Sequence, residues 1–430
     1  MSTEFGLFIG SMLLASAALG IGISIPAAIA RDPRELRFLR LIFVAALVLR
    51  CGLAVVTYIK FPYGYFAPDE AATVLAASNY LANTPSSPVA HGQGWVFFNI
   101  LVFRLFGSQP MLPRLWNCVV GAVTPLLGYA LARGFGAAAR GARWTAFLIA
   151  FFPSLVLWST LNLHDVDAYF MILIAFLITM RLQADLRWWH IVAVGLSICA
   201  MYLLRIFSDS ALLIAVVSGL LVSRVRVPRS IAVRMAGAAA GAIVVSIAGA
   251  LVFPRVGQLI YGRTGLGRLA DIRRSLASGA RSAVDVDPGL QSLGGVLAFL
   301  PFALVDFFLR PFPWERGSSL NLLTRPEVVL YYLLLPLVIL GIVVTVRKAA
   351  MRAIPSLVFL AITGVGYALV ISNLGTIYRE RDELLIVMFT FVGVAVDAIT
   401  TRLLRQRVGA SSRPASRPTG GRRGRAGHDT

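Results

Sequence analysis

Long apolar runs alternate with short polar segments along almost the whole chain. Runs of about 20 apolar residues are enough to cross a hydrocarbon layer of about 30 Å, so we predict about 11 membrane-spanning helices. The predicted spans are, in chain order, Phe5–Ala30, Leu41–Tyr58, Leu115–Leu131, Trp144–Trp158, Ala168–Met180, Trp189–Leu204, Ala211–Leu221, Ala236–Phe253, Val328–Val346, Ile354–Ile371 and Leu384–Ile399. This pattern is typical of an all-α, polytopic membrane protein.

Two further apolar runs, Trp95–Phe106 and Leu293–Leu309, lie inside longer segments that carry charge, residues 60–112 and 254–327. We interpret both runs as helices that lie along the membrane surface. The two long segments would then form a cap on one side of the membrane.

Basic residues in the short loops indicate which side that is. The loop Arg31–Arg40 holds four arginines, and short loops rich in arginine stay in the cytoplasm. The second span, Leu41–Tyr58, therefore exits outward into residues 60–112, and residues 254–327 are translocated regardless of their charge because that segment is long. We therefore predict an inner (plasma) membrane protein whose N-terminus and cap are external and whose C-terminus is cytoplasmic.

The composition agrees with a protein that is solvated mainly by lipid. Hydrophobic residues make up 58% of the chain and charged residues only 14%, against roughly 25% charged in a soluble domain. A net charge of +20 would suggest nucleic acid in a soluble protein. Here short loops and a basic tail carry the charge, so we expect anionic membrane lipids as partners and no nucleic acid.

We divide the chain into a membrane domain, residues 1–401, and a tail, residues 402–430. The tail carries eight arginines among Gly, Ser and Pro, so it is expected to be disordered. The cysteines Cys51, Cys118 and Cys199 all lie in predicted spans, which implies no disulfide framework.

Adjacent carboxylates directly follow the second predicted span. Asp69 and Glu70 stand after Pro68 at the start of a helical pattern. Charge near lipid is costly and often functional, which favours a catalytic role. The alternative is a helix start, where proline and acidic residues are also favoured.

The predicted topology gathers the chain's candidate chemistry on the external side. These residues are Asp69, Glu70, His91, His164, Asp165, Asp167, Glu315, Arg379 and Arg381. Carboxylates are suited to general-base work on a hydroxyl, and guanidinium groups to binding phosphate. The combination at a lipid surface indicates attack on a lipid-linked phosphoester.

Each of these residues also has a purely structural interpretation. Asp165 could cap a helix, Arg379 and Arg381 could contact headgroup phosphates, and His91 and His164 could be polar interface residues. Asp167 would point about 200° away from Asp165 on a helix. The chain's four histidines show no ligand spacing, so no metal site is predicted, although a divalent ion at Glu70 and Asp165 stays open.

The order of several motifs resembles a known superfamily. They are the Asp69-Glu70 pair, the apolar run that ends in Leu105-Phe-Gly107, the stretch Leu112–Arg133, Phe152-Pro-Ser154, Leu163-His-Asp165, Pro311–Glu315 and Gly375–Arg381. Over residues 40–400 the chain resembles the GT-C membrane glycosyltransferases, in particular family 39, which includes protein mannosyltransferases and aminoarabinose transferases. It departs from them at His91-Gly-Gln-Gly-Trp95, where many members have His-Pro-Pro.

The resemblance implies an inverting transfer of a sugar from a polyprenyl-phosphate donor to a glycan, lipid or protein acceptor in a bacterial cell envelope. Asp69 would act as the base, with Glu70 beside it. Arg379 and Arg381 would stabilise the departing phosphate, while Asp165, His91 and His164 would bind substrate. The alternatives are a transporter or flippase for a lipid-linked sugar and a polymerase of lipid-linked glycans.

Overall fold

The computed structural model describes residues 3–84, 93–224, 270–274, 289–315 and 319–411, and within them it contains helices and no strand. The helices are, in chain order, α1 (Thr3–Ile29), α2 (Pro33–Lys60), α3 (Pro68–Leu81), α4 (Gln93–Phe106), α5 (Met111–Gly134), α6 (Ala139–Phe151), α7 (Pro153–Trp158), α8 (Asp165–Ala184), α9 (Trp188–Leu204), α10 (Ile206–Arg224), α14 (Leu293–Leu309), α15 (Ser319–Val370) and α16 (Leu374–Ser411). The all-α prediction is confirmed for these residues.

Five helices in the described ranges are long and apolar enough to cross a membrane: α1, α2, α5, α15 and α16. Four shorter helices, α4, α9, α10 and α14, are also apolar. These helices indicate an integral membrane protein. The predicted span Ala236–Phe253 lies outside the described residues, so the count of about 11 spans stays a prediction.

Helix α15 is a hairpin of two arms rather than one rod. Ala349 interrupts it with non-helical backbone angles, φ −145° and ψ 40°. Tyr331 on the first arm lies 4.7 Å from the guanidinium of Arg381 on α16, and Tyr367 on the second arm donates a hydrogen bond to Glu383, also on α16. Both arms thus return to the same end of α16, as expected for the two separate spans predicted on either side of Arg347–Arg352.

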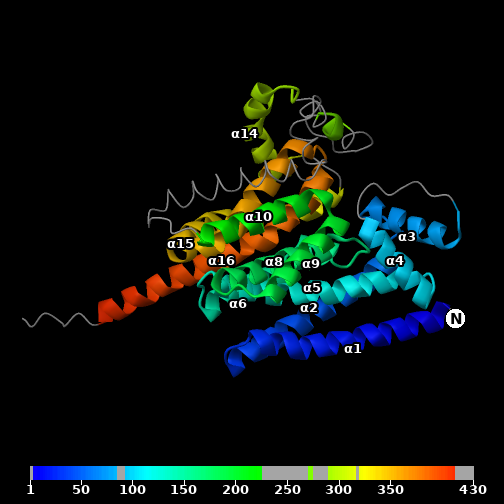
Figure 1. Cartoon of the computed structure of the whole chain (residues 1–430), viewed down its shortest axis with the longest axis horizontal. Helices are drawn as coiled ribbons and strands as arrows, with labels where there is room; N and C mark the ends of the chain where they lie inside the picture. Colours follow the sequence, from blue (N-terminus) through cyan, green and yellow to red (C-terminus); the bar gives the residue numbers. More distant parts are fainter. Residues whose placement is uncertain (1–2, 85–92, 225–269, 275–288, 316–318, 412–430) are drawn as a thin grey trace, which may run out of the picture.

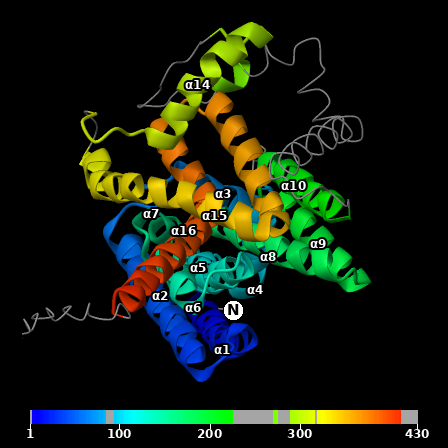
Figure 2. The same cartoon turned by 90° about the vertical axis from the view of Figure 1, so that its left-hand side faces the viewer.

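The long helices run roughly side by side along the longest dimension of the molecule (Figure 1). In this view α3 and α4 lie at the right-hand end, and α16 finishes at the left. Helices α5 and α16 are central: 83% and 72% of the 18-residue apolar segments of these helices are buried inside the protein. Helix α1 is peripheral, because only 11% of its apolar segment is buried. The end-on view shows α1 and α2 on one side of the bundle and α14 on the other (Figure 2).

Arg50 of α2 is buried and donates hydrogen bonds to backbone carbonyls where α6 ends and α7 begins. Pro153 has no amide N–H, so the carbonyl of Ile149 at the end of α6 lacks its usual partner. Arg50 donates to that carbonyl at 3.3 Å and to the carbonyl of Ala150 at 2.9 Å, and its Nε donates to Ser159 at 2.8 Å. Protein groups therefore surround the Arg50 guanidinium, which offsets the cost of a charge inside an apolar helix.

Candidate active site

Asp69 and Glu70 occupy the first turn of α3 but lie in opposite environments. Neighbouring residues on a helix point about 100° apart, and here the Asp69 side chain is 61% exposed whereas that of Glu70 is 1% exposed. Pro68 occupies the first turn, where its missing N–H costs nothing. The predicted pair therefore consists of one accessible and one buried carboxylate.

Glu70 fastens α3 to α5. Arg114 of α5 donates to both of its carboxylate oxygens, at 2.7 and 2.8 Å, and the backbone N–H of Asn162 donates to it at 2.7 Å. The rings of Tyr58 and Tyr63 lie 5.4 and 4.9 Å from the Arg114 guanidinium. A buried, bidentate ion pair with a third donor is a rigid anchor.

Asn162 extends this anchor to α4. Its side-chain amide donates to Asn99 at 2.8 Å and to the Tyr63 hydroxyl at 3.2 Å, and its carbonyl accepts from the Trp95 indole at 2.9 Å. Burial raises the pKa of the Tyr63 hydroxyl, so it remains protonated. These contacts fix α4 and the loop before α8 relative to α3.

Asp69 is held by an arginine that also reaches the interior. Arg379 of α16 donates to Asp69 Oδ2 at 2.7 Å, and its Nε lies 3.1 Å from Asp165 Oδ1 at the start of α8. Asp165 is fully buried and Arg379 is 14% exposed. In the described part of the chain, Asp69 Oδ1 has no hydrogen-bond partner.

A second arginine completes the group from the side of α9 and α10. Arg205, which follows α9, pairs with Asp165 and Glu380, and its Nη1 lies 2.9 Å from Glu383. The Tyr367 hydroxyl donates to Glu383 at 2.8 Å. We name this group the carboxylate cluster: Asp69, Asp165, Arg205, Arg379, Glu380 and Glu383.

The carboxylate cluster carries more negative than positive charge, with four acidic side chains and two guanidinium groups. Asp165 Oδ2 and Glu383 Oε1 are buried without a hydrogen-bond partner in the described structure. Within the same residues, no three His, Cys, Asp or Glu side chains are placed to hold a metal ion. The cluster can therefore accept a proton or bind a cationic group.

Of the two histidines predicted to bind substrate, His164 lies among the described residues and His91 does not. His164 precedes α8 and is partly buried, and burial lowers its pKa to about 4. It is neutral at physiological pH and can contact a sugar hydroxyl but not neutralise a phosphate. His91 lies outside the described residues.

The structure does not bring Arg381 to Asp69. Its side chain is buried, and its Nη1 donates to the carbonyl of Arg310 at 2.7 Å and to that of Phe308 at 3.3 Å. The ring of Tyr378 lies 5.7 Å from its guanidinium. Arg381 therefore caps the end of α14, since helix C-termini leave carbonyls without intrahelical donors.

Asp167 and Glu315 also lie outside the carboxylate cluster. Asp167 accepts a hydrogen bond from the Trp116 indole at 2.9 Å, on a different side of α8 from Asp165, as the helical spacing predicts. Glu315 accepts the backbone N–H of Phe312 at 3.1 Å and so holds its own loop.

The sequence analysis missed three members of the cluster: Arg205, Glu380 and Glu383. Arg205 interrupts two apolar helices, which was a signal of function or of a buried partner. In the run Arg379–Glu383, the first, second and fifth residues share one face of a helix and the third does not. The helical spacing therefore indicates that Arg379 and Arg381 point to different sides of the helix.

The chain matches no protein-family model and no curated protein. Among solved structures it is similar to the oligosaccharyltransferase of Archaeoglobus fulgidus in the apo form, with 14% identity and a TM-score of 0.44. The match covers 86% of this chain and 52% of the other, so the chain spans about half the length of that protein.

Proposed function

We propose that the protein is an inverting membrane glycosyltransferase that moves a sugar from a polyprenyl phosphate to an acceptor hydroxyl at the external membrane face. The observation that carries the proposal is the carboxylate cluster. Its exposed carboxylate, Asp69, is bound by Arg379, and Arg379 also contacts the buried carboxylate of Asp165. The exposed carboxylate can take a proton from a hydroxyl, and the guanidinium of Arg379 can donate to an oxygen of the departing phosphate.

Asp69 is the proposed general base. Its Oδ2 is occupied by Arg379, while Oδ1 is the oxygen available to the acceptor. Oδ1 takes the acceptor proton as the acceptor oxygen forms its bond to the anomeric carbon. The bond from that carbon to the phosphate oxygen breaks with its electron pair, and the polyprenyl phosphate leaves from the opposite face of the sugar.

Arg379 is the proposed phosphate-binding residue. Two of its nitrogens contact Asp69 and Asp165, and its Nη2, which has no hydrogen-bond partner among the described residues, can donate to a phosphate oxygen. Arg205 and the acids around it hold the guanidinium plane in place, which avoids reorganisation during transfer. Arg381 is assigned a positioning role, because its Nη1 donates to the carbonyls at the end of α14.

Glu70 is assigned to positioning rather than to proton transfer. Its oxygens accept from Arg114 and from the Asn162 N–H, and these contacts fix the turn that carries Asp69. Asp165 acts through Arg379, and His164 is placed to contact the neutral parts of a sugar. His91 is kept as a proposed substrate contact, and the acceptor is a glycan, a lipid or a protein.

The rival functions predict different products. A flippase moves a lipid-linked sugar across a membrane without changing it, and a polymerase joins one lipid-linked glycan to another. The position of the cluster at one end of the bundle favours transfer, because transporter sites lie near mid-membrane.

The test is to incubate the protein in detergent with polyprenyl-phosphate sugars and candidate acceptors, to analyse the lipid by mass spectrometry, and to determine the anomeric configuration of the glycoside by NMR. A transferase releases polyprenyl phosphate and forms a glycoside of inverted configuration. The proposal would be overturned in favour of a flippase by two results together. The donor would stay unchanged with every acceptor, and the same protein would transport the lipid in vesicles. A product that retains the lipid and grows by one glycan would indicate a polymerase.

A further inference from the structure

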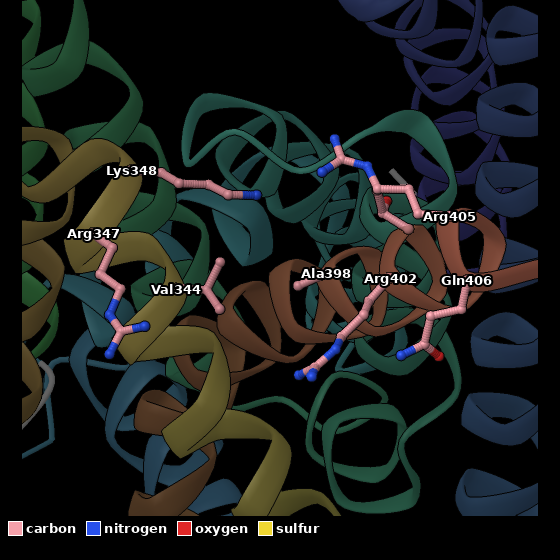
Figure 3. A pocket seen from close by; sticks show the side chains of 8 residues that line it. Val344, Arg347, Lys348, Ala398, Arg402, Arg405 and Gln406 are labelled. Atoms are coloured by element: carbon pink, nitrogen blue, oxygen red, sulfur yellow. The ribbon is translucent and has the colours of Figure 1, made fainter. Parts of the chain in front are cut away.

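A hollow of about 670 Å³ opens between α15 and α16, at the end of the bundle opposite the carboxylate cluster. Its basic lining residues are Arg347 and Lys348, before the turn of the α15 hairpin, and Arg402 and Arg405 on α16. Figure 3 shows the four side chains around the hollow. The volume lies in the range of small-ligand sites, roughly 300–1,000 Å³.

The four cations of this hollow have no acidic partner in the part of the chain that the structure describes. All four residues are exposed, and no carboxylate in the described ranges lies within ion-pair distance of them. Asp397, the acid beside the lining residue Ala398, is 6% exposed and its Cβ packs against Gly141 of α6. Four uncompensated cations around one concavity favour an anion.

Apolar surface continues from the hollow along both helices. Val344 and Ala398 line the hollow itself, and their neighbours Val343 and Ile399 are 41% and 38% exposed. A ligand with an anionic head and hydrocarbon chains can satisfy the cations and cover these side chains together.

We infer that this hollow binds the phosphodiester headgroup of an anionic phospholipid, with the acyl chains along α15 and α16. The three arginines present planar forks suited to phosphate oxygens, and Lys348 adds a fourth positive charge. Basic pockets between transmembrane helices on the cytoplasmic side are suited to such headgroups. The inference is independent of the proposed transferase activity.

A second hollow on the protein provides a matched control. Asp32, Pro33, Arg34 and Arg37 line it. Its two arginines are also exposed, but the Asp32 carboxylate is part of the lining. That carboxylate would repel a phosphate. Equal removal of charge from the two hollows therefore separates a specific site from general surface attraction.

The experiment measures binding of phosphatidylglycerol by native mass spectrometry, with phosphatidylcholine of the same acyl chains as the zwitterionic reference. Each cation near an anionic lipid contributes about fivefold in affinity, so Arg402→Gln with Arg405→Gln should weaken phosphatidylglycerol binding about 25-fold. Arg347→Gln with Lys348→Gln should do the same. The control, Arg34→Gln with Arg37→Gln, should bind as the unchanged protein does.

Two outcomes would overturn the inference. An equal loss in the control pair would show diffuse attraction to the basic end. Displacement of the lipid by saturating inorganic phosphate, with the same losses in the variants, would make the hollow a site for a soluble phosphate. Thermal unfolding tests whether each variant is folded. Because the substituted side chains are exposed, the unfolding temperature should change little.

Discussion

At the end of the bundle where α3 and α8 begin, four arginines lie against carboxylates or helix carbonyls. Arg114, Arg205 and Arg379 are paired with acids, and Arg381 with carbonyls. At the end where α16 finishes, Arg347, Lys348, Arg402 and Arg405 are exposed and have no such partner among the described residues. Basic side chains therefore have different surroundings, and different possible roles, at the two ends.

The difference follows from the cost of burying charge. A buried guanidinium is stable only if acids or carbonyls compensate it, and removal of one partner leaves an unpaired charge. Exposed cations carry no such cost, because water solvates them and they stay available to an external anion. The first end is consequently a rigid site that can hold reacting groups, and the second is a surface that can bind lipid.

The largest expected effect is on stability when Arg205 is removed. Arg205→Leu leaves Asp165, Glu380 and Glu383 without their shared cation, so we expect a loss of about 3–5 kcal/mol in unfolding free energy. Arg402→Leu, at the other end, should change it by no more than about 0.5 kcal/mol. Thermal unfolding of both variants in detergent checks the contrast, and equal shifts would remove the distinction between the two ends.

The Glu70–Arg114 pair should show strong coupling in a double-mutant cycle. Glu70→Gln alone leaves Arg114 buried and uncompensated, which should cost about 3–5 kcal/mol. The double variant Glu70→Gln, Arg114→Gln should recover at least about 2 kcal/mol relative to the sum of the single changes. Additive effects in chemical or thermal unfolding would contradict the description of this pair as the anchor of α3.

Replacement of Arg379 by lysine should affect transfer more than stability. Arg379→Lys keeps the charge but loses the fork that joins Asp69, Asp165 and the proposed phosphate. A charge-assisted hydrogen bond contributes about 1.5–3 kcal/mol, so we expect about 10–100-fold lower kcat/KM with the lipid donor. Arg405→Lys is the control, and a similar loss there would show that positive charge in general, rather than Arg379, limits the reaction.

At neutral pH the smallest expected effect is that of His164, because it develops only as the pH falls. Burial lowers its pKa to about 4, below the usual value near 6.5. Between these values the unfolded chain binds the proton more strongly, so this residue lowers stability as pH falls from about 6.5 toward 4. His164→Gln should flatten the loss of stability over that interval, as followed by thermal unfolding, and should leave the pH profile of transfer near neutrality unchanged.

The helices were predictable because apolar runs of this length have few other structures available to them. The hairpin of α15 was predictable as well, since Arg347 and Lys348 interrupt two apolar arms. Sequence spacing also indicated that Asp165 and Asp167 diverge, and they contact Arg379 and Trp116 respectively. The span Ala236–Phe253 and His91 lie outside the described residues and stay predictions.

The partners of the charged residues could not be predicted in the same way. Asp69 and Arg379 are separated by 310 positions, and Arg205 and Glu383 by 178. Such contacts depend on how the helices pack in three dimensions, which periodicity along one helix does not determine. The opposite exposures of Asp69 and Glu70 have the same origin, because either could have faced α5.

The proposed role of Asp69 is tested most directly by Asp69→Asn in purified protein with a polyprenyl-phosphate sugar and its acceptor. Asparagine can still accept from Arg379 and suits a helix start, but it cannot take a proton. As general base Asp69 should contribute about 10²–10⁴-fold to the rate. The control is Asp185→Asn, whose carboxylate is 58% exposed on the C-terminal side of α8. We predict that Asp69→Asn folds and binds the donor but transfers at least about 100-fold more slowly, while Asp185→Asn is unchanged. Transfer by Asp69→Asn at the rate of the unchanged protein would contradict the assignment of Asp69 as the base.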